Sequence, residues 1–284
     1  MLSESETRST VNRVTELLFE RPAAETDIDP FLSEVSKARD EFEIVCRLLL
    51  TREAIGKQLA RAVDLHLLTI HRARLLLVKF LLPAAREIID LGGANAPLYR
   101  MGYPHRFDRL VLVDLPPHER HEDFREVCVE RQEGGGEVVL RHGDMTSLSW
   151  VADSSVDMVW SGQSIEHVAR SGGLRMCEEA FRVLRPGGHF CLDTPNGTIT
   201  SVHAATAGLT FIHADHKVEY RPSELENMLL DCGFQVIDKR GICGMPLTSR
   251  SGVFAYEDFL LGGAITADLD SSYIQFFNCR KPDC

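Results

Sequence analysis

The sequence predicts an α/β fold built on a doubly wound, mainly parallel sheet of seven strands, with helices placed before it. From residue 83 onward, short apolar runs alternate with helical or polar segments, which is typical of strands joined by crossover helices. Before that point, residues 59–77 carry apolar side chains every three or four positions, which is the period of an amphipathic helix. The 284 residues are ample for a large buried core.

Residues 1–82 are expected to form a helical N-terminal extension. About the first 30 residues are polar and Glu-rich, with Pro22 and Pro30, and we expect them to be only loosely ordered. Residues 33–82 predict two or three helices that end before Pro83. These helices could pair two copies in a homodimer or cover a binding pocket.

Residues 83–284 are expected to form one domain with insertions. A helix with an apolar face at 174–184 precedes the fifth strand, and Pro222 and Gly233 bound another helix before the sixth. Insertions near 197–216 and 244–268 are expected to form a lid on the acceptor side, with 198–210 flexible. The candidate strands are apolar runs bounded by turn residues: 87–91, 109–113, 137–141, 156–160, 189–193, 234–239 and 273–279.

Charge and composition narrow the function classes. A net charge of −11 disfavours nucleic acid or an anionic membrane as a partner, because both attract clustered Lys and Arg. No run of about 18 apolar residues is present, so we expect no membrane span. The polar N-terminus does not have the pattern of a signal peptide, and the eight cysteines form no CxxC pair, which predicts a cytoplasmic protein.

Two acidic strand ends carry the first functional signal. Residues 88–96, IIDLGGANA, join a buried strand ending in Asp90 to a run of small residues that lets a ligand lie against the backbone. About 20 residues later, Asp114 ends the second strand, where an acid can accept both hydroxyls of a ribose. Alone, the loop could be an ordinary turn and Asp114 a helix cap.

Three further segments identify the family that the chain resembles. They are RHGDM at 141–145, SVDMVWSGQSIEHV at 155–168 and EAFRVLRPGG at 179–188. In this order and spacing they resemble the successive motifs of class I S-adenosylmethionine-dependent methyltransferases, which have a Rossmann-like fold. The resemblance is closest to small-molecule and sugar methyltransferases, and it covers about residues 86–240 and the last strand.

The resemblance implies a set of residues that bind S-adenosylmethionine and its product S-adenosylhomocysteine. The amino-acid part of the cofactor would lie over the glycine loop, the ribose on the second strand end, the adenine on the third, and the sulfonium near the fourth. The family's three alternating loop glycines are replaced here by Gly92, Ala94 and Ala96, with an added Gly93, so the path of the loop stays open. The implied set is Asp90, Gly92, Gly93, Ala94, Asp114, Leu115, Asp144, Met145, Ser161 and Gly162.

One segment resembles a different methyltransferase motif. Residues 114–117, DLPP, are similar to the Asp-Pro-Pro-Tyr motif of enzymes that methylate amino groups of nucleic-acid bases. That motif belongs after the fourth strand, where this chain has SGQS at 161–164. Methylation of base amino groups is therefore disfavoured.

The acceptor side needs a base if the acceptor is a hydroxyl, and histidine suits this role because its pKa lies near neutral pH. The candidates are His167, its neighbour Glu166, and His216, which begins a His-x-x-Glu-Tyr-x-Pro segment similar to that of related enzymes. Either histidine could instead be structural. His213, Asp215 and His216 could hold a divalent metal, but they lack a recognised ligand spacing, so we expect none.

The sequence thus predicts a methyltransferase that uses S-adenosylmethionine, most simply for O-methylation of a small-molecule or carbohydrate hydroxyl. N- or C-methylation of a small metabolite and an inactive cofactor-binding regulatory protein are the alternatives. An NAD-dependent oxidoreductase is disfavoured, because no Tyr-x-x-x-Lys pair is found. The acceptor itself does not follow from the sequence, because insertions build the acceptor pocket in this fold.

Overall fold

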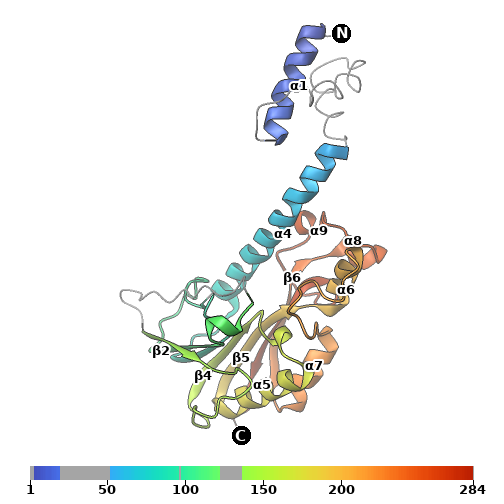
Figure 1. The fold of residues 1–284 in the computed structure, drawn as a ribbon. Helices are drawn as coiled ribbons and strands as arrows, with labels where there is room; N and C mark the ends of the chain where they lie inside the picture. Colours follow the sequence, from blue (N-terminus) through green and yellow to red (C-terminus); the bar gives the residue numbers. More distant parts are fainter. Residues whose placement is uncertain (1–2, 20–51, 96, 122–135, 284) are drawn as a thin grey trace. The chain divides into compact units, whose positions relative to one another are not determined.

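The computed structural model describes residues 3–19, 52–95, 97–121 and 136–283 (Figure 1). The chain divides into two compact units, residues 1–67 and 68–284. The division falls inside helix α4, Arg52–Leu81, so the second unit contains the end of this helix in addition to residues 83–284.

The first unit contains a helix that the sequence had not predicted. Helix α1, Glu4–Phe19, lies in the stretch expected to be loose, so that expectation is wrong for these residues. Its start has a reciprocal cap, in which the Ser3 backbone N–H donates to Glu6 Oε2 at 2.8 Å and the Glu6 N–H donates to Ser3 Oγ at 3.3 Å. The first part of the helical stretch expected over 33–82 lies outside the described residues.

The second unit is built on an eight-stranded sheet in the order β3-β2-β1-β4-β5-β8-β6-β7. Strands β1 to β5 are parallel neighbours, and β8 runs antiparallel between β5 and β6. The predicted α/β class is confirmed. The sheet contains the seven expected strands and one that was not predicted, the short edge strand β7. The strands are β1 Glu87–Leu91, β2 Arg109–Asp114, β3 Glu137–His142, β4 Val156–Gly162, β5 Leu184–Pro195, β6 Gln235–Gly244, β7 Ile265–Thr266 and β8 Ser272–Arg280.

Both faces of the central strands are buried, as expected for parallel strands covered by helices on each side. Alternate residues point to opposite faces, so Ile88 of β1 joins one apolar cluster and Ile89 joins the other. The first cluster includes Leu77 of α4, and the second includes Met176 of α5, Arg170–Val183, and Leu225 of α7, Pro222–Asp231. Helix packing on each face therefore holds the strand ends in fixed positions.

The strand order reverses between β1 and β4, which lie side by side. From β1 the chain proceeds to β2 and β3 on one side, whereas β4 leads to β5 on the other. At such a switch point the loops at the carboxyl ends diverge and leave a crevice where ligands bind in open α/β sheets. The turn after β4 contains a short 3₁₀ helix, η3, Ile165–His167, and another, η1, Pro117–Glu119, follows β2.

The two expected insertions contain regular structure. The segment expected to be flexible after β5 is mostly helix α6, Gly197–Thr206, so that expectation is wrong. Its cap, Asn196, is buried and accepts a hydrogen bond from the Thr198 backbone N–H at 2.9 Å. The second insertion contains helices α8, Pro246–Ser251, and α9, Asp258–Leu261, together with β7. No helix in the described ranges is long and apolar enough to cross a membrane.

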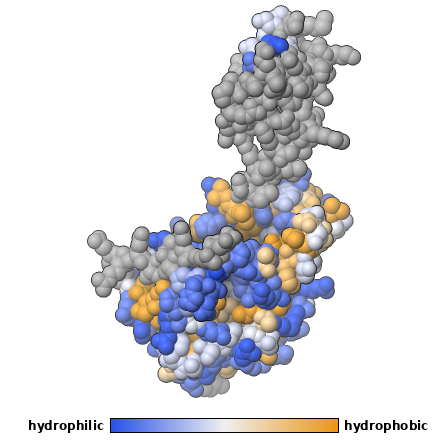
Figure 2. Space-filling model, in the orientation of Figure 1, coloured by the Kyte–Doolittle hydropathy of each residue, from blue (hydrophilic) through white to orange (hydrophobic). Residues whose placement is uncertain are grey.

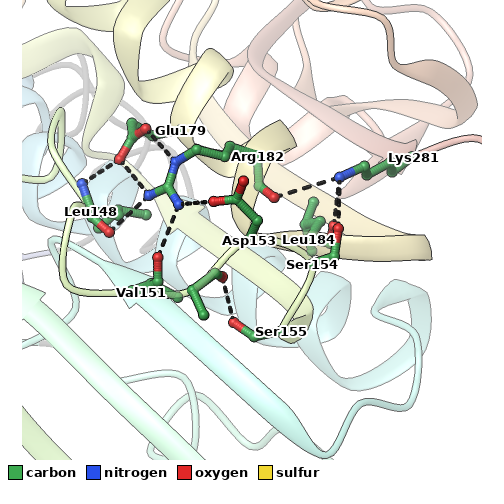
Figure 3. A network of polar contacts seen from close by, with 10 residues as sticks. Leu148, Val151, Asp153, Ser154, Ser155, Glu179, Arg182, Leu184 and Lys281 are labelled. Atoms are coloured by element: carbon green, nitrogen blue, oxygen red, sulfur yellow. Dashed lines mark hydrogen bonds and ion pairs between the residues drawn. The ribbon is translucent and has the colours of Figure 1, made fainter.

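An arginine network fastens the loop between β3 and β4 to helix α5 (Figure 3). The Arg182 guanidinium donates to the backbone carbonyls of Leu148 and Val151, both at 2.9 Å, and pairs with Asp153 at 2.6 Å. Glu179 pairs with the same guanidinium at 2.8 Å and accepts from the Leu148 N–H at 2.6 Å. The loop that begins with the candidate adenine acid is thus anchored to the body of the domain.

Candidate cofactor and acceptor site

The loop after β1 requires glycine at its first position. Gly92 has φ +76°, a left-handed conformation that side chains disfavour, and its N–H donates to the Val113 carbonyl at 2.8 Å. A Cβ placed on Gly92 would lie 2.2 Å from Ser164 Oγ, and one on Gly93 would lie 2.2 Å from the Asp90 carboxyl carbon. The small residues therefore let three strand ends meet closely at the crevice.

Asp90 is a buried carboxyl at this meeting point. It is 1% exposed, and its Oδ2 accepts a hydrogen bond from the Leu98 N–H at 2.8 Å. Burial raises the pKa of Asp90 to about 7, and the nearby Asp114 and Asp193 act in the same direction, whereas Arg74 opposes them. Asp90 is therefore poised to become charged when a cation comes close.

Asp114 connects the second strand end to the glycine loop. Its Oδ2 accepts from the Ala94 N–H at 3.1 Å, and its Oδ1 accepts from the Leu115 N–H at 2.8 Å and pairs with Arg120 Nε at 3.2 Å. Burial raises the pKa of Asp114, and Arg120 opposes the shift. Leu115 is 41% exposed, so it offers an apolar surface beside this acid. Arg120 was not among the predicted residues, and no spacing rule points to it.

The third strand end supplies the remaining predicted acid. Asp114 of β2 and His142 of β3 are paired in register, so these strands end at the same edge of the sheet. Asp144 follows two residues later, is exposed, and accepts a hydrogen bond from the Thr146 N–H at 2.8 Å. Met145 beside it is half-buried against the second apolar cluster. Asp144 is therefore available to a ligand at the edge next to Asp114.

The end of β4 meets a buried ion pair. Asp193, at the end of β5, accepts from Arg74 Nε at 2.8 Å and from Gln163 Nε2 at 2.9 Å. A Cβ on Gly162 would lie 2.6 Å from Arg74 Nη2, and Ser161 before it is fully buried. Arg74, Gln163 and Asp193 were not predicted. Asp193 could have been found, because it is an acid at a strand end, as Asp90 and Asp114 are.

The predicted acceptor-side residues form a tight cluster. Glu166, His167 and His216 each offer a ligand atom, and these atoms lie within 4.8 Å of one another. The two histidine rings are 5.0 Å apart in an edge-to-face arrangement. The Lys217 N–H donates to the Glu166 carbonyl at 2.8 Å, which joins the segment before α7 to η3. The fold thus brings together residues that are 50 positions apart in the chain.

His216 is held in one orientation by a carboxylate. Its Nδ1 donates to Glu219 Oε1 at 2.7 Å, and both side chains are buried. Glu219 also accepts from the Ile212 N–H at 2.9 Å and from the Thr200 hydroxyl. With its proton on Nδ1, His216 presents the lone pair of Nε2.

Burial shifts the other two members of the cluster in opposite senses. Burial raises the pKa of Glu166 to about 7, with His216 opposing the shift. Burial lowers the pKa of His167 to about 4, and His216 and His213 add to this effect. His167 is therefore neutral at pH 7 and is a weak base.

The metal candidates His213 and Asp215 lie beside this cluster. The His213 ring is 5.4 Å from that of His216 and 6.1 Å from that of His167. His213 Nδ1 accepts a hydrogen bond from the Asp215 N–H at 3.2 Å. Among the described residues, the group with metal-binding geometry contains His216 but neither His213 nor Asp215.

A second cleft lies at the opposite edge of the sheet. It has a volume of about 610 Å³ and is lined by residues at the amino ends of β1 and β4, including Arg86 and Asp157. Three of its arginines, Arg86, Arg185 and Arg280, are paired with carboxylates, as in the contact of Arg185 with Asp157 at 2.6 Å. Ligands of open α/β sheets bind at the carboxyl ends, so this cleft is not the candidate site.

Comparison with known proteins finds similarity to methyltransferases. A family model described as a methyltransferase domain matches residues 91–192. A probable S-adenosylmethionine-dependent methyltransferase from Mycolicibacterium smegmatis is 37% identical over 105 residues, which are 37% of this chain and 38% of that relative. Residues 91–192 are therefore similar to the methyltransferase domains of S-adenosylmethionine-dependent enzymes. The match to the Mycolicibacterium smegmatis protein spans 38% of that relative's length.

Solved structures share the fold of this methyltransferase domain. A possible histamine N-methyltransferase from Thermotoga maritima has a TM-score of 0.52 at 17% identity, over 80% of this chain and 95% of that one. The small RNA methyltransferase HEN1 has a TM-score of 0.50 at 16% identity, over 75% of this chain and 25% of that one. The fold therefore also occurs in an RNA methyltransferase, and the expected absence of a nucleic-acid partner gains no support from it.

Proposed function

We propose that this protein transfers a methyl group from S-adenosylmethionine to a hydroxyl of a small molecule or carbohydrate. The observation that supports a hydroxyl is the His216–Glu219 pair, whose 2.7 Å contact leaves the lone pair of Nε2 for the acceptor. A hydroxyl must lose a proton as it is methylated, whereas a neutral amine can attack before it loses one. A buried carboxylate that orients a histidine is the arrangement such a proton transfer needs.

The residues at the four strand ends fit the cofactor. The loop at Gly92 and Gly93 has no room for side chains, and Asp90, Asp114 and Asp144 lie at or just after the carboxyl ends of neighbouring parallel strands, which supports this proposal. When bound, S-adenosylmethionine supplies a methyl group made electrophilic by a positive sulfonium. Asp114 would accept the ribose hydroxyls and Asp144 the adenine amino group. Leu115, Met145, Ser161 and Gly162 would line the site, and Ala94 would continue the loop.

Arg74, which was not predicted from the sequence, would also bind the cofactor. Its guanidinium lies against Gly162 and pairs with Asp193 through Nε. The family resemblance places the methionyl part of the cofactor near Gly162, so the remaining guanidinium N–H groups would pair with the methionyl carboxylate.

The first experiment is a calorimetric titration of the purified full chain with S-adenosylhomocysteine, with Asp114→Ala as a variant and NAD as a control ligand. We expect micromolar binding by the wild type, at least tenfold weaker binding by Asp114→Ala, and no binding of NAD. Binding of NAD, or no binding of S-adenosylhomocysteine, would contradict the proposal at its first step.

The second experiment measures methyl transfer from labelled S-adenosylmethionine to a panel of hydroxylated and amine acceptors. With a hydroxyl acceptor, we expect His216→Asn to lower kcat about 100-fold or more while S-adenosylhomocysteine affinity stays within twofold. His105→Asn, an exposed histidine before β2, is the matched control with unchanged activity. Transfer to amines alone would replace O-methylation by N-methylation, and cofactor binding without any transfer would favour an inactive regulatory protein.

A further inference from the structure

We propose that Glu166, His167 and His216 bind a divalent first-row transition-metal cation, which holds the acceptor oxygen at the carboxyl end of β4. The cation binding is independent of the reaction, whereas the role toward the acceptor rests on the proposed function.

The donor set suits such a cation. One carboxylate and two imidazoles are ligands for Zn²⁺, Mn²⁺, Fe²⁺ and Co²⁺, whereas Mg²⁺ and Ca²⁺ prefer oxygen ligands throughout. The three ligand atoms lie within 4.8 Å of one another. Bond lengths of about 2.0–2.2 Å bring ligand atoms to roughly 3 Å apart, a contraction that side-chain rotations can supply.

The hydrogen bonding of Glu166 independently supports a cation at this position. The residue is fully buried, its Oε2 accepts from the Thr194 hydroxyl at 2.8 Å, and its Oε1 has no hydrogen-bond partner among the described residues. A buried carboxylate oxygen without a partner is destabilising unless a positive group compensates it. A cation between Glu166 and the two histidines would provide that compensation.

The surroundings of His216 and Glu166 resemble those of metal ligands. A ligating histidine ordinarily donates its other ring N–H to a carboxylate, which fixes the ring and makes the ligating nitrogen more basic. Glu219 does this for His216 at 2.7 Å, and it is itself held by the Ile212 N–H. Thr194 orients Glu166 in the same way. Two of the three ligands, Glu166 and His216, are therefore positioned before any cation arrives.

Three protein ligands leave a coordination position for another group, which is the pattern of catalytic rather than structural metal sites. His213 does not fill it, because its Nδ1 accepts a hydrogen bond and its proton is therefore on Nε2. An acceptor hydroxyl bound there would have a lowered pKa, so its proton would leave to water more readily. The lone pair of His216 would then hold the cation instead of taking the proton directly.

The test is a titration of the EDTA-treated full chain with MnCl₂, read by the loss of the free-ion EPR signal. We expect one Mn²⁺ per chain, with the Kd at least tenfold higher for Glu166→Gln and His216→Gln. Glu219→Gln, which removes only the outer partner, is expected to weaken binding about 10- to 100-fold. His213→Gln and His105→Asn are matched controls expected to stay within twofold of the wild type.

A second measurement does not depend on variants that fold. Pulsed EPR of the wild type with Mn²⁺ should show ¹⁴N couplings from coordinated imidazole. Absence of these couplings, substoichiometric binding, or equal affinity in Glu166→Gln and the wild type would overturn the proposed site.

Cofactor titrations on the same samples keep the two proposals apart. Full methyl transfer by EDTA-treated protein would overturn the cation's role toward the acceptor and leave the methyltransferase proposal standing. If the wild type does not bind S-adenosylhomocysteine, the proposed function is wrong. The Mn²⁺ titration would still decide whether the cation site exists.

Discussion

Three carboxyl groups end the strands at the crevice, and their surroundings differ. Asp193 is paired with Arg74 at 2.8 Å and Asp114 with Arg120 at 3.2 Å. Asp90 is held by one backbone N–H, from Leu98, and by burial that keeps its proton bound up to about pH 7. Asp90 is therefore the carboxyl whose charge a cationic ligand can change most.

The affinity for S-adenosylmethionine should depend on the charge of Asp90. The sulfonium and ammonium groups of the cofactor favour a carboxylate, so binding below pH 7 must release a proton from Asp90. We expect the Kd to fall as the pH rises from 5.5 to 7 and then to level off. Calorimetry in two buffers of different ionisation enthalpy would count the released proton, and Asp90→Asn should remove the dependence.

The raised pKa of Asp90 also makes the stability of the free protein depend on pH. The folded-state pKa of Asp90 lies above the unfolded value of about 3.9, so the folded state holds the proton longer. This group therefore destabilises the free protein progressively between about pH 4 and pH 7. A Kd for S-adenosylmethionine that stays constant between pH 5.5 and 7 would show that Asp90 does not contact the positive groups of the cofactor.

Among the elements, α6 shows how tertiary contacts make a helix from a weak sequence. Thr, Ala and Gly predominate in this segment, and its apolar stripe is short. Asn196 Nδ2 donates to the carbonyls of Leu269 and Ser272, each at 2.8 Å, while its Oδ1 caps the helix. Ile199 and Ala204 of the helix are buried. The start of α6 is thus fixed by the segment that leads into β8.

Replacing Asn196 should therefore destabilise the domain strongly. Asn196→Ala removes the side chain that accepts from the Thr198 N–H and donates to the carbonyls of Leu269 and Ser272, and we expect a loss of about 3 kcal/mol in the free energy of unfolding. Urea unfolding followed by circular dichroism would measure it. Ser201→Ala, on the exposed side of the same helix, should stay within about 0.5 kcal/mol. Equal losses in both variants would contradict the assigned role of Asn196.

At the scale of the whole molecule, the visible surface is mainly hydrophilic, with separate apolar patches (Figure 2), in keeping with the net charge of −11. Exposed apolar side chains include Leu260 and Leu261 of α9, which are 68% and 70% exposed. The ordered core of residues 68–284 lies on both sides of one sheet, so a ligand that joins the strand ends should stabilise this unit as a whole.

Cofactor binding should raise the thermal midpoint of this unit. At S-adenosylhomocysteine concentrations 100 times the Kd, linkage predicts about 2.7 kcal/mol of stabilisation. For a unit of this size, that corresponds to a rise in Tm of roughly 5–10 °C. Differential scanning calorimetry with S-adenosylhomocysteine and with NAD would check it. An equal shift with NAD would contradict the cofactor assignment.

The sequence by itself predicted the strands and the similarity to methyltransferases. Buried parallel strands are local apolar runs bounded by turns, and the residues at their ends sit in short motifs, so Asp90, Asp114 and Asp144 could be read directly. Three elements were not predicted from the sequence: the two-residue edge strand β7 and the helices α1 and α6. Short strands and helix caps give little periodic signal.

Only the tertiary structure decided which distant residues meet. Arg74 reaches Asp193 across 119 positions, and Glu219 orients His216 through contacts with Thr200 and Ile212. Such pairs depend on how helices and loops pack around the strand ends. The spacing of residues along the chain does not predict which of them meet. The positions of Asp90 and Asp114 at strand ends were therefore predictable, whereas the partners that set their charge and orientation were not.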